Sequence, residues 1–419
     1  MSTTTQIADA GDVKTQRRNK SDSSLKSLMS VNNLDSYSLP PSLSVTVARS
    51  HKRSFARNES YSPDAANTLT YVLSPGSDFV YGPDSFIQFQ LKIAVKSGTP
   101  TTATFGTTHT ALNLFKEIRI THASGIELEQ VSGFNLLNFV KTRYDRSNDW
   151  RARHDGVMGN GLEYAALLTG VDVSIPMSVL SEMFNMEKLL PSYLLAGLRI
   201  ELLLENADIA FDLDAGTISY TVDQPRMYLD SHTLTDSVQK ALARMSAVEG
   251  LDVSFASYYD EVHDLATGTR NTLSISKALS RVQDIRAVHR LTANIITGPA
   301  LKASLTPLNW DVTKWQASIG SMYFPSHEVD KNTVSYNLAV QGLDQNNHVT
   351  YTNWKAGESM LRVQLERSQI LTGSGIAISA NRGATLLQEF ASSAARTINL
   401  YVRHTRLVSV FIDNVAVRT

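Results

Sequence analysis

Residues 198–204 constrain the fold of this chain more than any other stretch, because their side chains alternate between apolar and polar with a period of two. Such alternation is typical of a strand, in which successive side chains point to opposite faces of the sheet. Arg199 and Glu201 would lie on the polar face, where Leu203 is the exception. The apolar face would carry Leu198, Ile200, Leu202 and Leu204. A strand of this kind belongs to an antiparallel sheet that is covered on one face.

The segment before this strand predicts a change of chain direction. Residues 179–184 have the spacing of a short amphipathic helix. Pro191 lacks an amide proton and restricts the residue before it, so this helix should not pass Leu190. The stretch 174–206 is therefore predicted to be a helix, a break and then a strand.

Length and composition indicate two globular domains. At 419 residues the chain exceeds the roughly 250–300 residues that one hydrophobic core can serve. Hydrophobic residues make up 42% and charged residues 19% of the chain, which is ordinary for globular proteins. The sequence has no cysteine, which excludes disulfides, thiolate nucleophiles and cysteine-ligated metal sites. We expect no signal peptide and no membrane helix, because no run reaches about 18 apolar residues.

Short strands separated by turn signals continue through both halves of the chain. Residues 114–120 and 126–129 flank the turn sequence HASG, which predicts a hairpin. In the second half, residues 361–366 and 398–403 again alternate between apolar and polar. The pattern predicts an all-β fold: two antiparallel β-sandwiches in tandem, with short helices in the connections and a flexible N-terminal arm.

Changes in composition and pattern divide the chain into four parts. The two sandwiches are predicted to be joined by a helix that Thr235 caps and Gly250 ends. Residues 96–110, 145–170 and 298–330 are predicted to be long loops. The predicted parts are a flexible basic N-terminal arm at 1–60, a first sandwich at 61–232, a helical linker at 233–250 and a second sandwich at 251–419.

The amino-terminal 58 residues are polar and basic. Nine basic and four acidic side chains give them a net charge of +5. Such a segment buries too little apolar surface to fold alone, so we expect its deletion to leave both sandwiches folded. It could neutralise phosphates without reading sequence, order on a neighbouring subunit, or be an ordinary solvated terminus. The candidate residues for contact with nucleic acid are Arg17, Arg18, Lys20, Lys52, Arg53 and Arg57.

The sequence offers no catalytic constellation, and we expect no enzymatic activity, no cofactor and no bound metal. Glu127 and Glu129 lie two apart on one predicted strand; an acid/base pair is conceivable, but a solvated strand face is favoured. Residues 258–261 (YYDE) could bind a sugar or a cation, but an exposed loop is favoured. The histidines are scattered, and a structural role is favoured for those in a turn or near strands, which are His122, His289 and His404.

Four segments occur in an order that resembles a known family. The first half holds LFKEIRITHASGIELEQVSGFN and then SIPMSVLSEMFNMEKLLPSYLLAGLRIELLLEN. The second half holds ISKALSRV at 275–282 and MYFPSHEVDKNTVSYNL at 322–338. Together they resemble viral major capsid proteins of the double jelly-roll lineage, which occurs in Polinton-like and related eukaryotic DNA viruses.

The resemblance implies that each sandwich is a jelly roll and that the protein is a structural subunit of a virion. Copies would assemble as pseudo-hexameric trimers into an icosahedral shell around the genome, in the cytoplasm or nucleus of the host cell. The implied partners are copies of the same chain, a minor or penton capsid protein and, through the basic arm on the inner side of the shell, the genome. No small-molecule substrate is implied.

Two alternatives stay open at this point. The chain could be a single jelly-roll capsid protein with an appended β domain, since the pattern does not mark all the strands of two jelly rolls. It could instead be a carbohydrate-binding tandem β-sandwich, because jelly rolls also serve lectins. In a lectin, the aromatic residues Trp310, Trp315 and Trp354 would be exposed beside polar loops.

Overall fold

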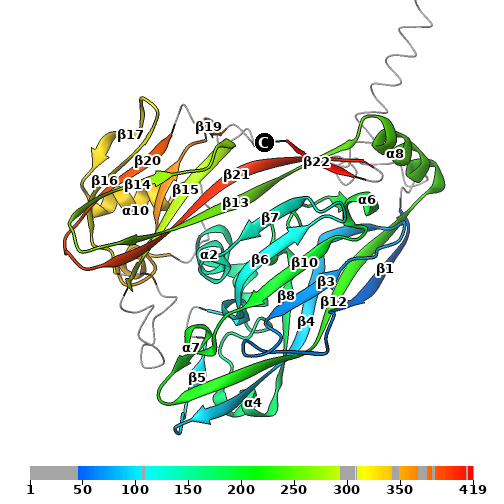
Figure 1. The fold of residues 1–419 in the computed structure, drawn as a ribbon, viewed down its shortest axis with the longest axis horizontal. Helices are drawn as coiled ribbons and strands as arrows, with labels where there is room; N and C mark the ends of the chain where they lie inside the picture. The colour runs from blue at the N-terminus through cyan, green and yellow to red at the C-terminus, as the bar shows by residue number, and fades with distance from the viewer. Residues whose placement is uncertain are drawn as a thin grey trace, which may run out of the picture.

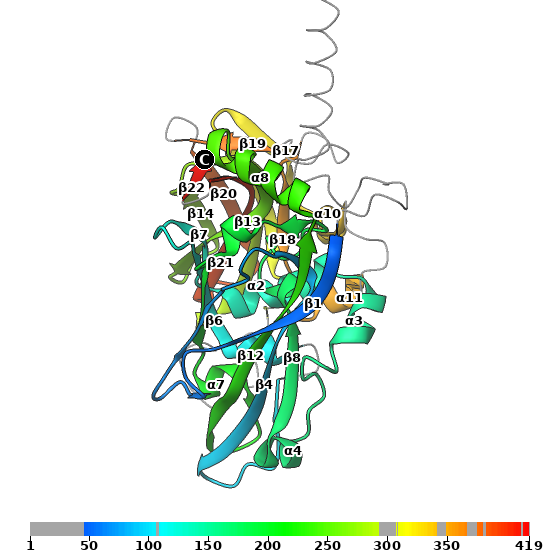
Figure 2. The same cartoon turned by 90° about the vertical axis from the view of Figure 1, so that its right-hand side faces the viewer.

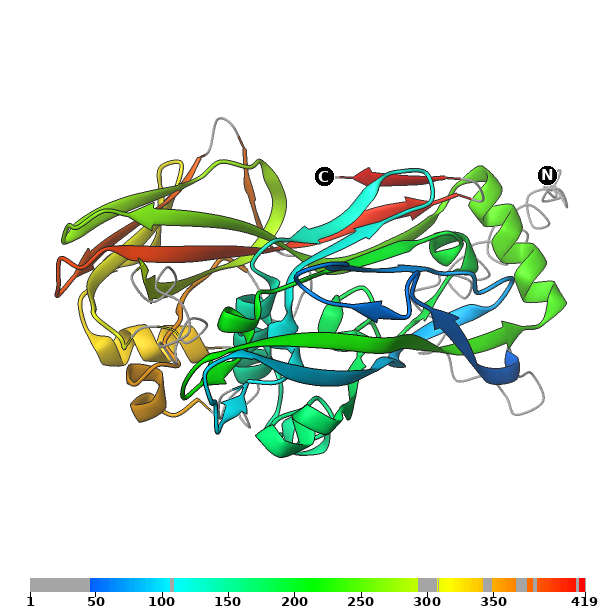
Figure 3. The ribbon, with the colours of Figure 1, turned by 60° about the horizontal axis from the view of Figure 1, so that its bottom comes forward.

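The computed structural model describes residues 46–105, 109–292, 307, 309–341, 349–366, 375–379, 383–411 and 414–418. It consists of two β-rich bodies, which the helix α8 (Asp236–Val248) joins at one end of the molecule (Figure 1). In the view turned by 90°, the second body lies above the first (Figure 2). The third view shows the long strands of each body running side by side (Figure 3).

The first body contains two main antiparallel sheets. Its strands are β1 (Thr46–Phe55), β2 (Ser60–Tyr61), β3 (Thr68–Val72), β4 (Phe79–Ser97), β5 (Ala103–Thr104), β6 (Phe115–Thr121), β7 (Glu127–Val131), β8 (Val171–Pro176), β9 (Leu189–Leu190), β10 (Arg199–Leu204), β11 (Asp212–Leu213) and β12 (Thr217–Leu234). One sheet has the order β1–β12–β4–β8, with β2 beside β12 and β9 beside β4. The other has the order β3–β10–β6–β7, and β5 pairs with β11 separately.

The second body also contains two antiparallel sheets. Its strands are β13 (Leu251–Leu265), β14 (Arg270–Ile275), β15 (Leu279–Leu291), β16 (Val312–Ile319), β17 (Met322–Val329), β18 (Leu361–Gln364), β19 (Ile376–Ile378), β20 (Ala384–Phe390), β21 (Arg396–Val410) and β22 (Val415–Arg418). One sheet has the order β13–β21–β15–β18, with β19 beside β15 and β22 beside β21. The other has the order β14–β20–β16–β17.

The same strand order occurs in both bodies. When the main strands of each body are numbered along the chain, one sheet joins strands 1, 8, 3 and 6 and the other joins strands 2, 7, 4 and 5. Two antiparallel sheets made from eight such strands form a jelly roll. The predicted fold class, two jelly-roll sandwiches in tandem, is confirmed. The alternative of one jelly roll with an appended β domain is wrong, because the second body has the full set of main strands.

The strand predicted at 198–204 is β10, which lies in the middle of its sheet between β3 and β6. Ile200 pairs with Ile120, and Leu202 pairs with Ile118, so the apolar face of the pattern points into the core. Each of these fully buried side chains contributes about 1.5–3 kcal/mol to folding. Leu203, the exception in the pattern, is only partly buried. The predicted hairpin at 114–129 is present as β6 and β7.

The connections contain more regular structure than the sequence predicts. The helix predicted at 179–184 is shorter and lies earlier, and Pro191 occupies the N-cap position of the next helix. The predicted loop at 145–170 contains two helices, and the predicted loop at 298–330 contains β16 and β17. The helical segments are η2 (Ala111–Leu114), α2 (Phe134–Val140), the π-helical turn η3 (Lys141–Asp145), α3 (Asn148–His154), α4 (Tyr164–Thr169), α5 (Met177–Leu180), α6 (Ser192–Leu195), α7 (Ala207–Ala210), α8, α10 (Asn332–Val340) and α11 (Tyr351–Lys355).

The linker helix α8 lies within the predicted linker segment. Thr235 occupies its N-cap position, although the Thr235 side chain makes no capping hydrogen bond. Gly250 follows the helix at a φ of 78°, a left-handed conformation that ends helices at little steric cost. Among the described residues, no helix has both the length and the apolar character needed to cross a bilayer.

The boundary of the predicted arm needs a correction. β1 and β2 lie inside the segment 1–60, and β1 pairs with β12 from Thr46 opposite Leu234 to Phe55 opposite Arg226. β1 is an edge strand that is mostly exposed on both faces, so its sequence carries no apolar alternation. Residues 1–45 lie outside the described residues. A deletion that spares the sheet must therefore end before Thr46 and not at residue 58.

Candidate functional site: the seam between the two jelly rolls

The candidate functional site is the contact surface between the two jelly rolls, which we call the seam. One side of the seam is the edge strand β7 with α2 and η3, and the other side is the outer face of the sheet that holds β13, β21 and β15 (Figure 1). Edge strands expose unpaired backbone groups that favour uncontrolled pairing with other chains. In this molecule, the second jelly roll covers the β7 edge of the first.

Side chains of the second jelly roll bind the backbone where β7 leads into α2. The Asp260 carboxylate accepts hydrogen bonds from the backbone N–H of Ser132 at 3.0 Å and of Gly133 at 3.2 Å. The Tyr401 hydroxyl donates to the Gly133 carbonyl oxygen at 2.8 Å. These bonds fix one jelly roll against the other without a backbone ladder between them.

A network of buried charges crosses the seam. The Arg286 guanidinium is fully buried and donates to Asp284 at 2.9 Å within the second jelly roll. It also donates to Asp145 of η3, in the first jelly roll, at 2.8 Å. Arg362 of β18 donates to Asp284 at 3.1 Å. Arg286, Arg362 and Asp284 are thus buried together, Asp145 is partly buried beside them, and each has a partner of opposite charge.

Attraction between opposite charges determines the pKa values of Asp284 and Arg286. Burial alone would raise the pKa of Asp284, but Arg286 and Arg362 outweigh burial and hold this pKa below its usual value. Burial alone would lower the pKa of Arg286, but Asp145 and Asp284 outweigh it and raise this pKa. Asp284 and Arg286 are therefore both charged at neutral pH.

A second set of contacts connects the α2–η3 segment to the loop before β18. Arg143 forms an ion pair with Glu358 at 2.9 Å, and both side chains are nearly buried. The Tyr144 hydroxyl donates to the Glu358 carbonyl oxygen at 2.5 Å. One glutamate of the second jelly roll thus binds two neighbouring residues of the first.

Glu129 differs from the sequence prediction. A register shift in the β6–β7 pair leaves Glu127 exposed and turns Glu129 into the seam, so the two carboxylates do not share a face. Glu129 accepts hydrogen bonds from Ser181 and, across the seam, from Ser257 of β13 at 3.2 Å. Burial raises the pKa of Glu129. The favoured solvated face is wrong for Glu129, because a β-bulge changes the alternation of faces.

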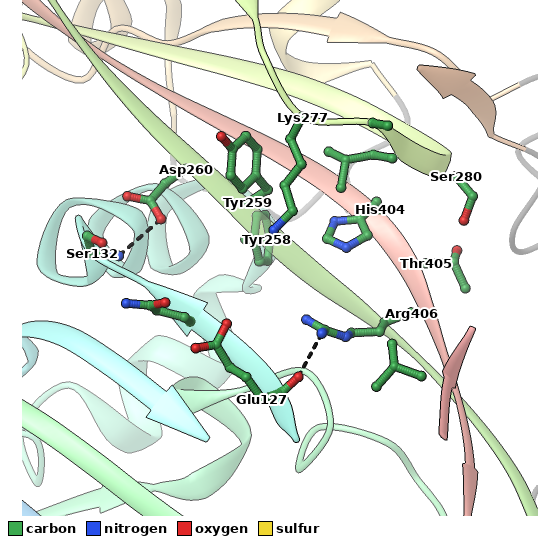
Figure 4. Close-up of a pocket in the computed structure, with 14 residues that line it drawn as sticks. Glu127, Ser132, Tyr258, Tyr259, Asp260, Lys277, Ser280, His404, Thr405 and Arg406 are labelled. Carbon is green, nitrogen blue, oxygen red and sulfur yellow. Dashed lines mark hydrogen bonds between the residues drawn. The ribbon is translucent and has the colours of Figure 1, made fainter. Parts of the chain in front are cut away.

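A pocket of about 200 Å³ opens at one end of the seam (Figure 4). Figure 4 shows Glu127 and Ser132 of the first jelly roll facing Arg406 and Asp260 of the second. Arg406 donates to the Glu127 carbonyl oxygen at 2.8 Å. The residues 258–261, predicted as an exposed loop, lie within β13 instead. Among the described residues, no group of His, Asp and Glu side chains could hold a metal ion.

The histidines predicted to be structural are buried. His289 lies in β15 and His404 in β21, and burial lowers the pKa of each to about 4, so both are neutral at pH 7. The His122 ring contacts Ser124 within the β6–β7 turn at 2.9 Å. These contacts agree with a structural role for all three.

Three of the predicted nucleic-acid contacts, Lys52, Arg53 and Arg57, lie among the described residues. Lys52 forms an ion pair with Asp78 at 2.7 Å, and the Arg53 guanidinium lies 5.3 Å from the centre of the Phe55 ring. Arg57 is exposed, and its backbone N–H donates to Thr70 at 3.0 Å. The remaining candidates, Arg17, Arg18 and Lys20, lie outside the described residues.

The three tryptophans of the lectin alternative are buried. Trp310, Trp315 and Trp354 are 8%, 2% and 0% exposed, and Trp310 packs against Trp354 with ring centres 4.2 Å apart. The Trp315 indole donates to the Ser335 hydroxyl at 2.9 Å. These side chains stabilise the second core and offer no platform for a sugar ring.

The sequence did not reveal the residues that build the seam. Asp284, Arg286 and Tyr401 alternate with apolar residues on their strands, a pattern that in sequence predicts a solvated outer face. A possible signal was the mixture of arginine, tyrosine and carboxylate on those faces. Of these residue types, arginine and tyrosine are enriched at protein interfaces, whereas carboxylates are depleted there.

Topology and seam together define the class of fold: two jelly rolls of the same strand order, fused side by side in one chain. VP54 of PBCV-1, in a crystal structure fitted into a cryo-EM reconstruction of the virophage Sputnik, matches with a TM-score of 0.62 and 10% identity, over 91% of this chain and 99% of that chain. The Faustovirus major capsid protein matches with a TM-score of 0.63 and 9% identity, over 90% of this chain and 92% of that chain.

The mavirus major capsid protein matches with a TM-score of 0.53 and 10% identity, over 92% of both chains. Identities this low establish a common fold and no more. No protein-family model and no curated protein sequence matches this chain. The resemblance drawn from the sequence is confirmed at the level of the double jelly-roll fold.

Proposed function

We propose that this chain is the major capsid protein of an icosahedral virus, and that its copies assemble first into pseudo-hexameric trimers and then into a shell. The main observation behind the proposal is that the chain contains two jelly rolls of the same strand order, which buried ion pairs hold together. Three such chains supply six similar wall units, which closed threefold symmetry arranges as a hexagonal block. The capsid proteins that share this fold over most of their length support the same function.

The proposed partners follow from that geometry. Copies of the same chain make the trimer and the shell. A minor or penton capsid protein is proposed at the fivefold positions, because hexagonal blocks alone tile a plane and cannot close a shell. The proposed location is the virion, after assembly in the cytoplasm or nucleus of the host cell. A role without catalysis is proposed for the whole chain.

The basic arm is proposed to contact the genome on the inner side of the shell. Residues 1–45, which precede the first strand, carry five basic and four acidic side chains and so a net charge of +1. The support for phosphate contacts that do not read sequence therefore comes from the local cluster of Arg17, Arg18 and Lys20. Lys52 and Arg53 already contact groups of the first jelly roll, so the phosphate contacts are assigned to Arg17, Arg18 and Lys20, with Arg57 at the base of the arm.

Expression of the chain without other viral proteins tests the main proposal. Light scattering after size exclusion should give the mass of three chains, and electron microscopy should show hexagonal particles or closed shells. A stable monomer at all concentrations, with binding on a glycan array, would support the carbohydrate-binding alternative instead.

Neutralising the arm tests the proposed genome contact. Binding to double-stranded DNA is measured as a function of salt. The combined change Arg17→Ala, Arg18→Ala and Lys20→Ala should make the plot of log binding constant against log salt concentration less steep by about 2.7, because each lost phosphate contact contributes about 0.9. The control is Asp9→Ala, Asp12→Ala and Asp22→Ala in the same arm, which should not reduce binding. Equal salt slopes for wild type and the basic variant would show that the arm does not touch phosphate.

A further inference from the structure

The seam uses only half of the surfaces that the repeated topology provides. It joins the β7–α2 edge of the first jelly roll to the outer face of the β13–β21–β15–β18 sheet. By strand order, the counterpart of that edge in the second jelly roll is β17 with α10, and the counterpart of that face in the first is the β1–β12–β4–β8 sheet. Within the part of the chain that the structure describes, no jelly roll covers either counterpart, because the chain has one seam.

Exposed apolar side chains mark both counterparts. On β1, Phe55 is 61% exposed, and on β17, Tyr323 is 59% and Met322 is 40% exposed. Val334 of α10 is 37% exposed. Large apolar residues exposed in this way mark interaction sites when they gather on one surface.

The β1 side carries a row of large side chains across the sheet. Arg53 pairs with Tyr228, and Tyr228 pairs with Phe86, so the three share the outer face. The Tyr228 and Phe86 rings stack with centres 4.9 Å apart, and both remain partly exposed. Phe55 lies two residues after Arg53, on the same face. Aromatic and arginine side chains of this kind dominate the binding energy of protein interfaces.

The β17 side carries a matching hollow. A cavity of about 330 Å³ opens between β17, α10 and β18. Its lining is mixed: Phe324, Pro325 and Leu338 are apolar, Gln341 and Gln364 are polar, and Glu366 places a carboxylate there. The other charged lining residue, Arg362, already binds Asp284. A hollow with an apolar part and a carboxylate suits an aromatic side chain that has an arginine beside it.

We infer that the β17–α10 edge of one copy packs on the β1–β12 face of a second copy, with Phe55 of that copy seated in the cavity beside β17. This inference rests on the proposed self-assembly and names the surfaces that perform it. The contact joins two different surfaces, so it is heterologous and closes into a ring when three chains follow one another. Internal seams and contacts between copies would then alternate around six jelly rolls.

Cysteine cross-linking of the full chain tests this inference, because the sequence has no cysteine of its own. The variant Phe55→Cys/Tyr323→Cys should form covalent trimers with a short bis-maleimide. A mixture of the single variants Phe55→Cys and Tyr323→Cys should form dimers, whereas each single variant alone should form none. The control pair Val262→Cys/Tyr323→Cys, which uses an equally exposed residue of β13, should stay uncross-linked.

A charged substitution gives an independent readout. Phe55→Asp should weaken trimer formation at least tenfold in sedimentation, without changing the thermal unfolding of the monomer, because Phe55 is exposed in the single chain. Two results together would overturn this inference: normal trimers of the Phe55→Asp variant, and no cross-linking of the Phe55→Cys/Tyr323→Cys variant. They would leave the capsid proposal intact. A single variant that cross-links to itself would also overturn it, because it would indicate a symmetric contact. A wild-type chain that never forms trimers would refute the capsid proposal itself.

Discussion

Arg286 shows how a single residue can hold two domains together. Its guanidinium is fully buried, yet it binds one carboxylate from each jelly roll, Asp284 at 2.9 Å and Asp145 at 2.8 Å. A buried ion pair is expensive to desolvate, and its value often lies in fixing one arrangement over others. Here the arrangement that it fixes is the angle between the two jelly rolls.

Replacement of Arg286 by methionine should destabilise the protein strongly. The change leaves Asp145 and Asp284 buried with too few cations, which costs about 3–5 kcal/mol. Urea unfolding measures this loss. The control is Arg270→Met, which removes an ion pair to Glu389 whose arginine is largely exposed, and it should change stability by about 0–1 kcal/mol. Equal effects of the two substitutions would show that the buried network does not hold the seam.

Glu129 should make the stability of the seam depend on pH. Burial raises its pKa in the folded protein above the ordinary 4.5. A carboxyl group with a raised folded pKa contributes stability that is fully present below the unfolded pKa and is lost as pH rises through the folded pKa.

The variant Glu129→Gln removes this ionisation and keeps an acceptor for Ser181 and Ser257. Its stability relative to wild type should therefore increase as pH rises from about 4.5 to 7. Unfolding free energies measured across that window test the sign. A difference between variant and wild type that stays constant with pH would contradict the assignment.

At the scale of elements, two edge strands of the first jelly roll, β7 and β1, differ in their surroundings. β7 is covered by side chains of the second jelly roll, whereas β1 is open and carries Arg49, Lys52 and Arg53. Cationic side chains on an edge strand discourage unspecific pairing with other strands. The β7–α2 corner fits under Tyr401 because residue 133 is glycine.

A Cβ atom at position 133 would lie 2.7 Å from the Tyr401 hydroxyl oxygen and 3.2 Å from the Asn399 amide nitrogen. Gly133→Ala should therefore cost about 1–3 kcal/mol of unfolding free energy. The control Gly156→Ala, where a Cβ would meet nothing within 4 Å, should leave stability unchanged or slightly raised. The double variant Gly133→Ala/Tyr401→Phe should recover part of the loss, and no recovery would place the strain elsewhere.

At the scale of the whole molecule, the seam and the linker helix α8 both connect the jelly rolls. Val248 at the end of α8 is 79% exposed, which makes this site suitable for an inserted protease sequence. After cleavage there, the two fragments should elute together in native buffer and separate only in denaturant, because the seam holds them. Cleavage in the Arg286→Met background should let them separate at a lower urea concentration. Separation of the wild-type fragments in native buffer would show that the covalent linker, and not the seam, maintains the pair.

Local patterns in the sequence were sufficient for the class of fold. Alternation at 198–204 and the HASG turn depend on the period of a strand and the geometry of a tight turn, which neighbouring residues set by themselves. They predicted β10 and the β6–β7 hairpin, and the repeated pattern predicted two sandwiches. The sequence does not predict β1, because both faces of this strand are exposed. It predicts a loop in place of β16 and β17.

The seam was decided by tertiary structure alone. Asp284, Arg286 and Tyr401 lie on strand faces that the sequence periodicity predicts to be exposed to solvent. Glu129 lies in the seam because β7 contains a one-residue bulge. Periodicity reports which side of a strand faces its own core and carries no information about a second domain on the other side. The sequence by itself therefore determined two antiparallel β-sandwiches, because most of their strands are specified locally. Their mutual orientation required contacts between residues more than a hundred positions apart, which only the folded chain brings together.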